Sequence, residues 1–474
     1  MPMQSTNPAT GEILAKFEPW NASELDQVLK QVTEANALWC QVSLADRCAL
    51  LRNAAQKLRS NQQSLATLVC QEMGKLFSEA LAEVEKCAAG CEYYADHAPA
   101  FLQNEVISSD AGKSYVCSQP LGTILAIMPW NFPLWQVFRF AAPALVAGNT
   151  AVLKHASNVP QCALAIESIL IDAGFPANVF RTLMIDASQV KSVIEDARVQ
   201  AVTLTGSESA GRMVAAQAGA SLKKTVLELG GSDAFVVLED ADLSLVIKNA
   251  VTSRFLNAGQ SCIAAKRFIV VDAIVEQFTK DFKAAVEALV VGDPMDPDTD
   301  IAPMARADLR DALHQQVLDS LQQGASAVTG CSLAAGSTLG DSTLPNSTLS
   351  PQGAAGNGAF YPPSILGNVR PGMRAYDEEL FGPVASIIHA DDEAHALHIA
   401  NDSRFGLGGS VWTADKTRGE KFALQMQSGV VFVNGFVKSD PRLPFGGIKA
   451  SGYGRELSHY GMREFMNTKT IWIR

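Results

Sequence analysis

Short strand-like segments that alternate with helical patterns are the feature that most constrains how this chain can fold. Six such apolar runs, mostly bounded by turn residues, lie at 122–128, 150–154, 201–205, 225–229, 234–238 and 267–271. Runs of this kind predict strands that are buried on both faces of a sheet. The residues between them have helical spacing, as in 160–173. The alternation predicts an α/β fold with mostly parallel sheets and helices on both faces.

Two further regions have patterns of their own. Residues 23–99 carry apolar side chains at three- and four-residue spacing, which predicts helices. Residues 330–358 contain Gly, Ser, Thr, Ala and Pro with few large apolar side chains. That composition predicts an exposed, mobile loop, long enough to suggest an insertion. A chain of 474 residues is too long for one ordinary core, so we expect two or three domains.

Charge, hydropathy and cysteine usage restrict the partners and the compartment. The net charge of -11 argues against a nucleic-acid or anionic-membrane partner. The most apolar stretch, 121–146, is interrupted by prolines and Arg139, so we do not expect it to span a membrane. Nine cysteines without a Cys-x-x-Cys spacing indicate reduced thiols in a cytoplasmic protein and no zinc site. The N-terminus has no secretory-signal pattern.

Two residues, Glu228 and Cys262, point to covalent chemistry. Glu228 ends an apolar run and precedes two glycines, while Cys262 follows Gly259-Gln260 in a stretch with little charge. A thiol nucleophile and a carboxylate base together permit a two-step mechanism with an acyl group on sulfur. Near a helix terminus or loop, backbone N–H groups would favour the thiolate. The alternatives are a cysteine that fills a core and a strand-end carboxylate that reaches solvent.

Six motifs occur in an order that resembles the aldehyde dehydrogenase superfamily. They are Pro129-Trp130-Asn131-Phe132-Pro133, Thr205-Gly206-Ser207-x-x-x-Gly211, Glu228-Leu-Gly-Gly231, Asn257-x-Gly-Gln-x-Cys262, Glu379-Leu-Phe-Gly-Pro383 and Pro444-Phe-Gly-Gly-Ile-Lys-x-Ser-Gly452. The resemblance covers nearly the whole chain. Within the superfamily, 128–137 and Lys154-His155-Ala156 most resemble the bacterial succinate-semialdehyde dehydrogenases.

The resemblance implies a catalytic role for each of four residues. Cys262 would attack the aldehyde carbon to form a thiohemiacetal, and the amide of Asn131 with the Cys262 backbone N–H would hold the oxyanion. After hydride transfer, Glu228 would activate the water that cleaves the thioacyl enzyme. Glu456 matches a carboxylate of a proton relay, with an ordinary helix cap as the alternative. Asn131 could instead be a simple turn residue.

The resemblance also implies an NAD(P)+ cofactor and no required metal. Lys154 and Ser157 match positions that meet the adenosine ribose, and Glu379 matches the one that holds the nicotinamide ribose. The full set of implied cofactor-binding residues is Trp130, Lys154, Ser157, Gly206, Ser207, Gly211, Glu379 and Phe381. NAD-preferring relatives commonly carry a glutamate at the position of Ser157, which would repel a 2′-phosphate. Serine removes that repulsion, so we expect NADP+ to be accepted.

Arg139 and Ser439 match positions that bind the distal carboxylate in succinate-semialdehyde dehydrogenases. An arginine suits a carboxylate through paired hydrogen bonds, although a surface salt bridge is the alternative. The chain departs from some relatives in two places: Leu256 stands where they have a second arginine, and Ala264 stands where they have a second cysteine. One carboxylate contact is therefore missing, and Lys438 could replace its charge.

The implied architecture has three parts. A Rossmann-like coenzyme-binding domain would comprise 1–100 and 121–230, an α/β catalytic domain 231–453, and a small β oligomerisation arm 101–120 and 454–474. We expect a homodimer or homotetramer. The leading prediction is oxidation of succinate semialdehyde to succinate. The alternatives are a dehydrogenase for another small aliphatic aldehyde, a CoA-acylating dehydrogenase, and a non-catalytic relative with a structural or binding role.

Overall fold

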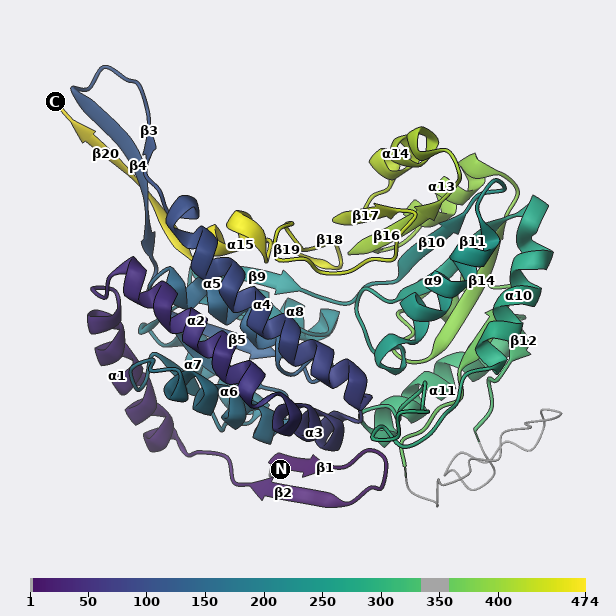
Figure 1. Cartoon of the computed structure of the whole chain (residues 1–474), viewed down its shortest axis with the longest axis horizontal. Coiled ribbons are helices and arrows are strands. Elements are labelled where there is room, and N and C mark those ends of the chain that lie inside the picture. Colours follow the sequence, from purple (N-terminus) through teal and green to yellow (C-terminus); the bar gives the residue numbers. More distant parts are fainter. Residues whose placement is uncertain (1–2, 334–357) are drawn as a thin grey trace.

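The computed structural model describes residues 3–333 and 358–474, which form two α/β lobes with a β arm projecting from the first lobe (Figure 1). Most of the predicted loop at 330–358 lies outside the described residues. At its described beginning, Cys331 is buried, so the expected exposure does not extend to that residue.

The first lobe is built on a six-stranded sheet, in which every pair is parallel except the outermost. Its spatial order is β19 (Gly452–Tyr453), β9 (Lys224–Glu228), β8 (Val199–Thr205), β5 (Thr123–Met128), β6 (Thr150–His155) and β7 (Phe180–Thr182). Side chains alternate across the sheet, so Ile124 and Ala126 enter one core and Leu125 enters the other. The prediction of parallel strands buried on both faces is confirmed.

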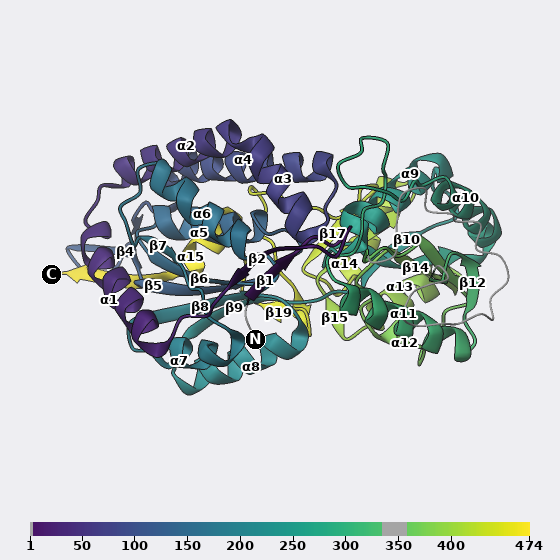
Figure 2. The ribbon, with the colours of Figure 1, turned by 90° about the horizontal axis from the view of Figure 1, so that it is seen from below.

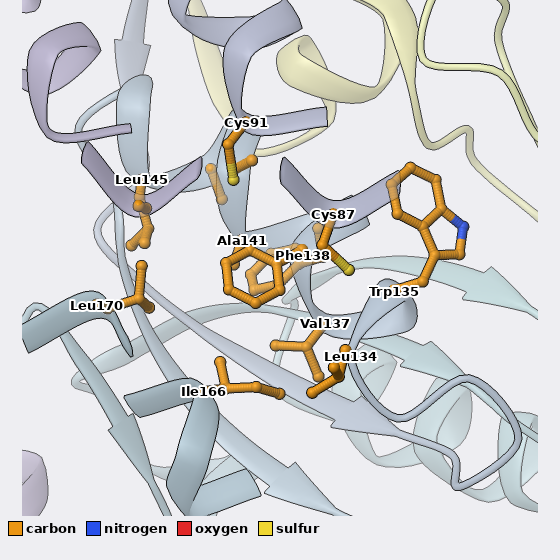
Figure 3. Packing of buried hydrophobic residues seen from close by; sticks show 14 of the residues in the cluster. Cys87, Cys91, Leu134, Trp135, Val137, Phe138, Ala141, Leu145, Ile166 and Leu170 are labelled. Carbon is orange, nitrogen blue, oxygen red and sulfur yellow. The ribbon is translucent and has the colours of Figure 1, made fainter. Parts of the chain in front are cut away.

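Helices cover both faces of this sheet (Figure 2). Helices α2 to α6 contribute to one core: α2 (Leu44–Ser60), α3 (Gln62–Met73), α4 (Phe77–Phe101), α5 (Trp135–Val146) and α6 (Pro160–Asp172). Helices α1 (Ala22–Trp39), α7 (Val190–Glu195) and α8 (Glu208–Ala220) contribute to the other. Figure 3 shows side chains of α4, α5 and α6 packed in the first core. A Cβ at Gly90 of α4 would lie only 3.1 Å from the Trp135 ring, so the absent side chain lets α5 approach closely.

Local sequence sets many of the helix boundaries. Asn21 and Glu24 form a capping box at the start of α1, and the hydroxyl of Ser43 accepts from the Asp46 N–H at the start of α2. Pro160 occupies the first turn of α6, where its missing N–H does no harm. The predicted helical region 23–99 therefore divides into four helices.

The second lobe is built on a seven-stranded sheet that is parallel except for the pair at its β12 edge. Its order is β12 (Ser326–Thr329), β13 (Ser364–Gly367), β14 (Val384–Ala390), β11 (Ala265–Val271), β10 (Asp233–Val237), β16 (Gly408–Trp412) and β17 (Val430–Val433). The helices of this lobe are α9 (Leu243–Phe255), α10 (Val275–Glu287), α11 (Ala307–Gln322), α12 (Arg374–Asp377), α13 (Glu393–Asn401) and α14 (Lys416–Gln425). Separate cores again lie on the two faces.

The ends of the chain form smaller sheets. Strands β1 (Met3–Thr6) and β2 (Ile13–Phe17) make a hairpin, while β3 (Glu105–Val106), β4 (Lys113–Pro120) and β20 (Met466–Ile473) make the projecting arm (Figure 1). Strands β15 (Phe405–Gly406) and β18 (Ile448–Lys449) pair beneath the second lobe's sheet, and α15 (Ser458–Glu464) packs against α5. The predicted domain boundaries stay predictions. In the described parts of the chain, no helix is long and apolar enough to cross a membrane.

The chain passes from the first sheet to the second directly after Glu228, and it returns after β17. On its return it adds β19 beside β9, with Gly452 opposite Glu228. Both passages therefore lie next to Glu228, at the carboxyl ends of the first lobe's parallel strands. Loops at this end of parallel strands commonly hold ligands.

Candidate active site

Cys262 lies in a loop between α9 and β11 with an unusual backbone. In the 3-10 turn Leu256–Gly259, residues Asn257, Ala258 and Gly259 have φ values of 56°, 51° and 72°. Only glycine suits the third position, because a Cβ at Gly259 would lie 2.4 Å from the carbonyl oxygen of Gly382. The glycines of two predicted motifs therefore meet here.

Buried Arg254 holds this loop in place. Its guanidinium donates to the carbonyl oxygens of Ala265 at 2.9 Å, Gly259 at 2.7 Å and Gly382 at 2.5 Å. These acceptors come from both sides of Cys262 and from the 379–383 motif. A planar guanidinium with five N–H donors can join such dispersed carbonyls without an acidic partner.

A network of side-chain amides joins the Cys262 loop to the loop that contains Asn131. Nδ2 of Asn131 donates to the backbone oxygen of Gln260 at 3.0 Å, and Nδ2 of Asn257 donates to the backbone oxygen of Asn131 at 2.8 Å. The backbone N–H of Asn257 donates to Glu79 of α4, and the Gln260 side chain accepts from the Ala305 N–H at 2.9 Å. Asn131 therefore takes part in this hydrogen-bond network and does not serve only as a turn residue. Its second amide hydrogen remains for another acceptor.

Helix α4 also supports the Asn131 loop. The Glu83 carboxylate accepts from the backbone N–H groups of Leu134 and Trp135 at 2.9 and 3.0 Å. It caps the positive end of α5, which favours a carboxylate. Lys75 pairs with Glu83, and its ammonium lies 3.7 Å from the ring centroid of Phe132.

The Cys262 thiol is only half-buried, but its surroundings disfavour the thiolate. Burial raises its pKa to about 12 despite nearby Lys266 and Arg139, which lower it. The expected stabilisation of the thiolate is therefore outweighed by desolvation in this state, because the loop offers too little compensating charge. Lys266 is the main opposing group. Its ammonium donates to the carbonyl oxygens of Ser261 at 2.8 Å and Cys262 at 2.6 Å.

Glu228 and Glu456 form a second buried group around Arg139. Arg139 pairs with Glu456 and donates to the Thr205 hydroxyl at 3.3 Å. Neither oxygen of Glu228 has a hydrogen-bond partner among the described residues. Burial and the charge of Glu456 raise the pKa of Glu228 well above its ordinary value, and burial also raises the pKa of Glu456. The Glu456 side chain makes no cap on α15, so the helix-cap alternative is not observed.

The structure does not join Glu228 to Cys262 directly. No hydrogen bond or ion pair connects the two among residues 3–333 and 358–474. The Glu228 carboxylate lies instead toward Gly446, where a Cβ would be 2.6 Å from one of its oxygens. Arg139 is the group whose charge acts on Glu228, Glu456 and Cys262 alike. The two catalytic candidates therefore share an electrostatic environment without touching.

The predicted adenosine-side residues gather at the carboxyl edge of the first sheet. Ser157 is exposed just beyond β6, and Lys154 donates to the His155 carbonyl at 2.7 Å. Ser207 caps α8 and, like neighbouring Gly206, has accessible surface. An exposed helix N-terminus of this kind suits a phosphate. Gly211 is buried instead, and a Cβ there would lie 2.5 Å from Leu229, so it brings α8 close to the sheet.

The predicted nicotinamide-side residues lie near the Cys262 loop. Glu379 pairs with Lys266 at 3.2 Å and accepts from the Gly231 N–H at 3.1 Å. The Phe381 and Trp130 rings meet edge to face at 5.8 Å. These residues stand beside Lys266, and Lys266 contacts the Cys262 carbonyl. A redox ring placed here would lie close to the thiol.

The two predicted substrate residues occupy different settings. Arg139 is committed to Glu456, whereas the Ser439 hydroxyl accepts from Lys86 of α4 at 2.7 Å and from the Trp135 indole at 3.2 Å. Lys438 is exposed. Lys86 was absent from the sequence predictions.

Several functional candidates escaped sequence reasoning. Lys266 lies at the start of the buried strand β11, where a charged residue is a usable signal, whereas Arg254 lies in the last turn of α9 and gives no such signal. The residues of α4, Glu79, Glu83 and Lys86, lie on an amphipathic helix at spacings of four and three, which is also typical of a solvated face. Only the packing of α4 against α5 and the Cys262 loop distinguishes these two cases.

Comparisons with known proteins identify the family to which the chain is similar. Residues 1–471 match the family model described as "Aldehyde dehydrogenase family". The chain is 47% identical over 469 residues to the succinate semialdehyde dehydrogenase (NAD(P)+) Sad of Escherichia coli K12, covering 99% of this chain and 97% of that one. It is 46% identical over 478 residues to succinate-semialdehyde dehydrogenase (NADP+) 1 of Mycobacterium tuberculosis H37Rv, with both chains fully covered.

A solved structure with the same fold also matches nearly the whole chain. The succinic semialdehyde dehydrogenase from Streptococcus pyogenes, crystallised with NADP+, superposes with a TM-score of 0.93 at 38% identity. The match covers 99% of each chain.

Replacing Gly259 with alanine should destabilise the Cys262 loop. The left-handed backbone and the clash with Gly382 together should cost about 2–4 kcal/mol of unfolding free energy. The matched control is Gly372→Ala, whose φ is 89° but whose Cβ would meet no atom within 4 Å. That variant should lose only about 1 kcal/mol. Chemical denaturation followed by circular dichroism checks both values, and equal losses would contradict the close-contact explanation.

Replacing Lys266 with methionine should make Cys262 less reactive. Removing the nearest positive charge raises the pKa of a thiol that burial already raises, so less thiolate exists at any given pH. We expect alkylation of Cys262 by iodoacetamide at pH 8 to slow roughly tenfold, which corresponds to about one pKa unit. Mass spectrometry of the Cys262 peptide provides the rate. Lys266→Arg keeps the charge and should alkylate at a rate close to that of the unmodified protein.

Proposed function

This chain belongs to the aldehyde dehydrogenase family, and we propose that it oxidises succinate semialdehyde to succinate with NADP+ or NAD+. The observation that carries the proposal is that Asn131 is hydrogen-bonded to the Cys262 loop, while the charge of Arg139 acts on Cys262, Glu228 and Glu456 alike. The likeness to succinate-semialdehyde dehydrogenases of Escherichia coli and Mycobacterium tuberculosis supports the choice of substrate.

Acylation begins at Cys262. The thiol gives its proton to water and its sulfur forms a bond with the aldehyde carbon, while the electron pair of the C=O π bond moves to the carbonyl oxygen as a negative charge. The free amide hydrogen of Asn131 and the backbone N–H of Cys262 stabilise that oxyanion. The dinucleotide, when bound, supplies the hydride acceptor that turns the thiohemiacetal into a thioester. Lys266 assists by holding the Cys262 carbonyl and by opposing the raised pKa of the thiol.

Deacylation depends on Glu228. Its carboxylate removes a proton from water, the water oxygen attacks the thioester carbon, and the Cys262 sulfur leaves as the acid forms. The pKa of Glu228 is raised by burial and by Glu456, so the base form becomes more abundant as pH increases. Arg139 opposes this rise and balances the charge of Glu456. We assign Glu456 the role of a proton relay for Glu228, which is supported by the effect of its charge on the pKa of Glu228.

The residues at the first sheet's edge suit a dinucleotide with a 2′-phosphate. Ser157 is exposed and uncharged, and the ammonium of Lys154 on β6 donates to the His155 carbonyl and forms no ion pair within 4 Å among the described residues. The helix N-terminus at Ser207 suits the pyrophosphate. We propose that the enzyme accepts NADP+ as well as NAD+, with Ser157 permitting the phosphate.

We also propose a cytoplasmic homo-oligomer. All nine cysteines are free, which is consistent with a reducing compartment. In the arm, Val106, Trp472 and Ile473 are exposed at 80%, 51% and 48%. An open sheet edge with exposed apolar side chains is suited to pairing with another subunit.

A steady-state panel tests the proposed reaction. Purified protein should reduce NADP+ or NAD+ with succinate semialdehyde, without CoA, and with a higher kcat/KM than with butanal or acetaldehyde. An absolute requirement for CoA would indicate the CoA-acylating alternative. Absence of turnover with every aldehyde would favour a non-catalytic relative.

Replacing Glu228 with glutamine should separate the two half-reactions. The neutral amide cannot accept a proton from water, so steady-state turnover should fall roughly 10²- to 10⁴-fold. One equivalent of NADPH per active site should still form in a rapid burst, because acylation uses Cys262. Stopped-flow absorbance measures the burst, and Cys262→Ser should abolish it. Loss of the burst in the glutamine variant would place Glu228 in acylation instead.

A further inference from the structure

The side chain of Lys86 is held by two residues, Ser439 and Trp135, and Ser439 is one of the predicted substrate-binding residues. It extends from α4, and its ammonium lies 2.7 Å from the Ser439 hydroxyl and 4.6 Å from the ring centroid of Trp135. The Trp135 indole N–H donates to the same hydroxyl at 3.2 Å. A hydroxyl has two acceptor lone pairs and one hydrogen. Because Lys86 and Trp135 occupy both lone pairs, the Ser439 hydroxyl can make a further hydrogen bond only as a donor.

Lys86 differs from Lys75 and Lys266 in lacking an acidic partner among the described residues. Lys75 pairs with Glu83, and Lys266 pairs with Glu379. In the described parts of the chain, no carboxylate lies within 4 Å of the Lys86 ammonium. Its half-buried position therefore presents a positive charge and a hydroxyl donor without a counter-ion, which is the complement of a carboxylate.

The charged groups around Lys86 do not neutralise it. Arg139 faces it from α5 and, together with burial, lowers the pKa of Lys86 to about 8. Glu83, one turn earlier on α4, is bound to Lys75 and to the start of α5. Asp440, next to Ser439, is bound by Arg442 at 2.5 Å. The Cys87 thiol lies alongside on α4 and adds only a small effect.

Arg139 carries no surplus charge for a substrate. Its guanidinium is paired with Glu456, so the two groups sum to zero when both are ionised. Leu256, directly before Asn257, is uncharged and supplies no second cation. Of the two described side chains that donate to the Ser439 hydroxyl, Lys86 is the one that carries a positive charge.

We infer that Lys86 binds the distal carboxylate of the aldehyde substrate, with the Ser439 hydroxyl as its partner donor. Arg139 then acts as a positioning residue that holds Glu456 and orients the catalytic carboxylates. This assignment rests on the proposed function, because it names the group by which a carboxylated aldehyde is distinguished from a neutral one of similar length.

A pair of substrates and a pair of variants test the assignment. Lys86→Met keeps the length and apolar stem of the side chain but removes its charge. Lys438→Met tests the rival assignment, in which exposed Lys438 supplies the charge for the carboxylate. In Lys86→Met, kcat/KM for succinate semialdehyde should fall roughly 10- to 100-fold, mainly through KM. Activity with butanal should stay within about threefold, which also shows that the variant is folded. Lys438→Met should change kcat/KM for neither substrate, because the Lys438 side chain is exposed.

The pH dependence provides a second test that needs no variant. The ratio of kcat/KM for succinate semialdehyde to that for butanal cancels the titrations of Cys262 and Glu228. Above pH 8 Lys86 loses its proton and its attraction for a carboxylate, so the ratio should decrease as pH rises. In Lys86→Met the ratio should be low and independent of pH.

The outcomes separate this inference from the proposed function. If the unmodified enzyme shows no preference for succinate semialdehyde over butanal, the proposed function is wrong. If it shows the preference but Lys86→Met keeps it, or if Lys438→Met removes it, then Lys86 is not the carboxylate-binding residue. A preference that does not change between pH 7 and pH 9.5 would overturn the assignment even if the variant failed to fold.

Discussion

The hydrogen bonds among Asn131, Asn257 and Gln260 connect the two lobes at the point where the chemistry must occur. Asn131 belongs to the first sheet's loops, and Asn257 and Gln260 belong to the loop that precedes Cys262. Each bond is buried, so breaking it would leave a polar group without water to replace its partner. The contacts that join the lobes therefore also hold Asn131, the proposed oxyanion donor, against the Cys262 loop.

Buried cations hold the loops of the site in place. Arg254 and Lys266 bind mainly to backbone carbonyls, which hold the loop firmly while leaving positive potential near the thiol. Arg139, in contrast, is paired with Glu456 and controls the proton balance around Glu228. In the proposed mechanism, Lys266 therefore acts near the thiol, while Arg139 and Glu456 act on the protonation of Glu228.

Sequence reasoning identified most of the fold because buried parallel strands leave a strong local pattern. The runs at 150–154 and 201–205 correspond closely to β6 and β8. The motif residues were predicted from the family resemblance. Residues such as Glu83 and Lys86 were not, because their role depends on which face of α4 meets α5. The raised pKa of Cys262 depends on the packing of distant segments, so no local pattern could have revealed it.

The pairing of β19 with β9 has a consequence for the order of events during synthesis. The first lobe's sheet lacks its outermost strand until residues 452–453 have left the ribosome, and α15 and β20 emerge later still. The second lobe can gather its own core meanwhile, but Glu456 cannot reach Arg139 before translation is nearly complete. A ribosome-bound nascent chain would therefore lack both β19 and the Arg139–Glu456 pair until these last residues emerge.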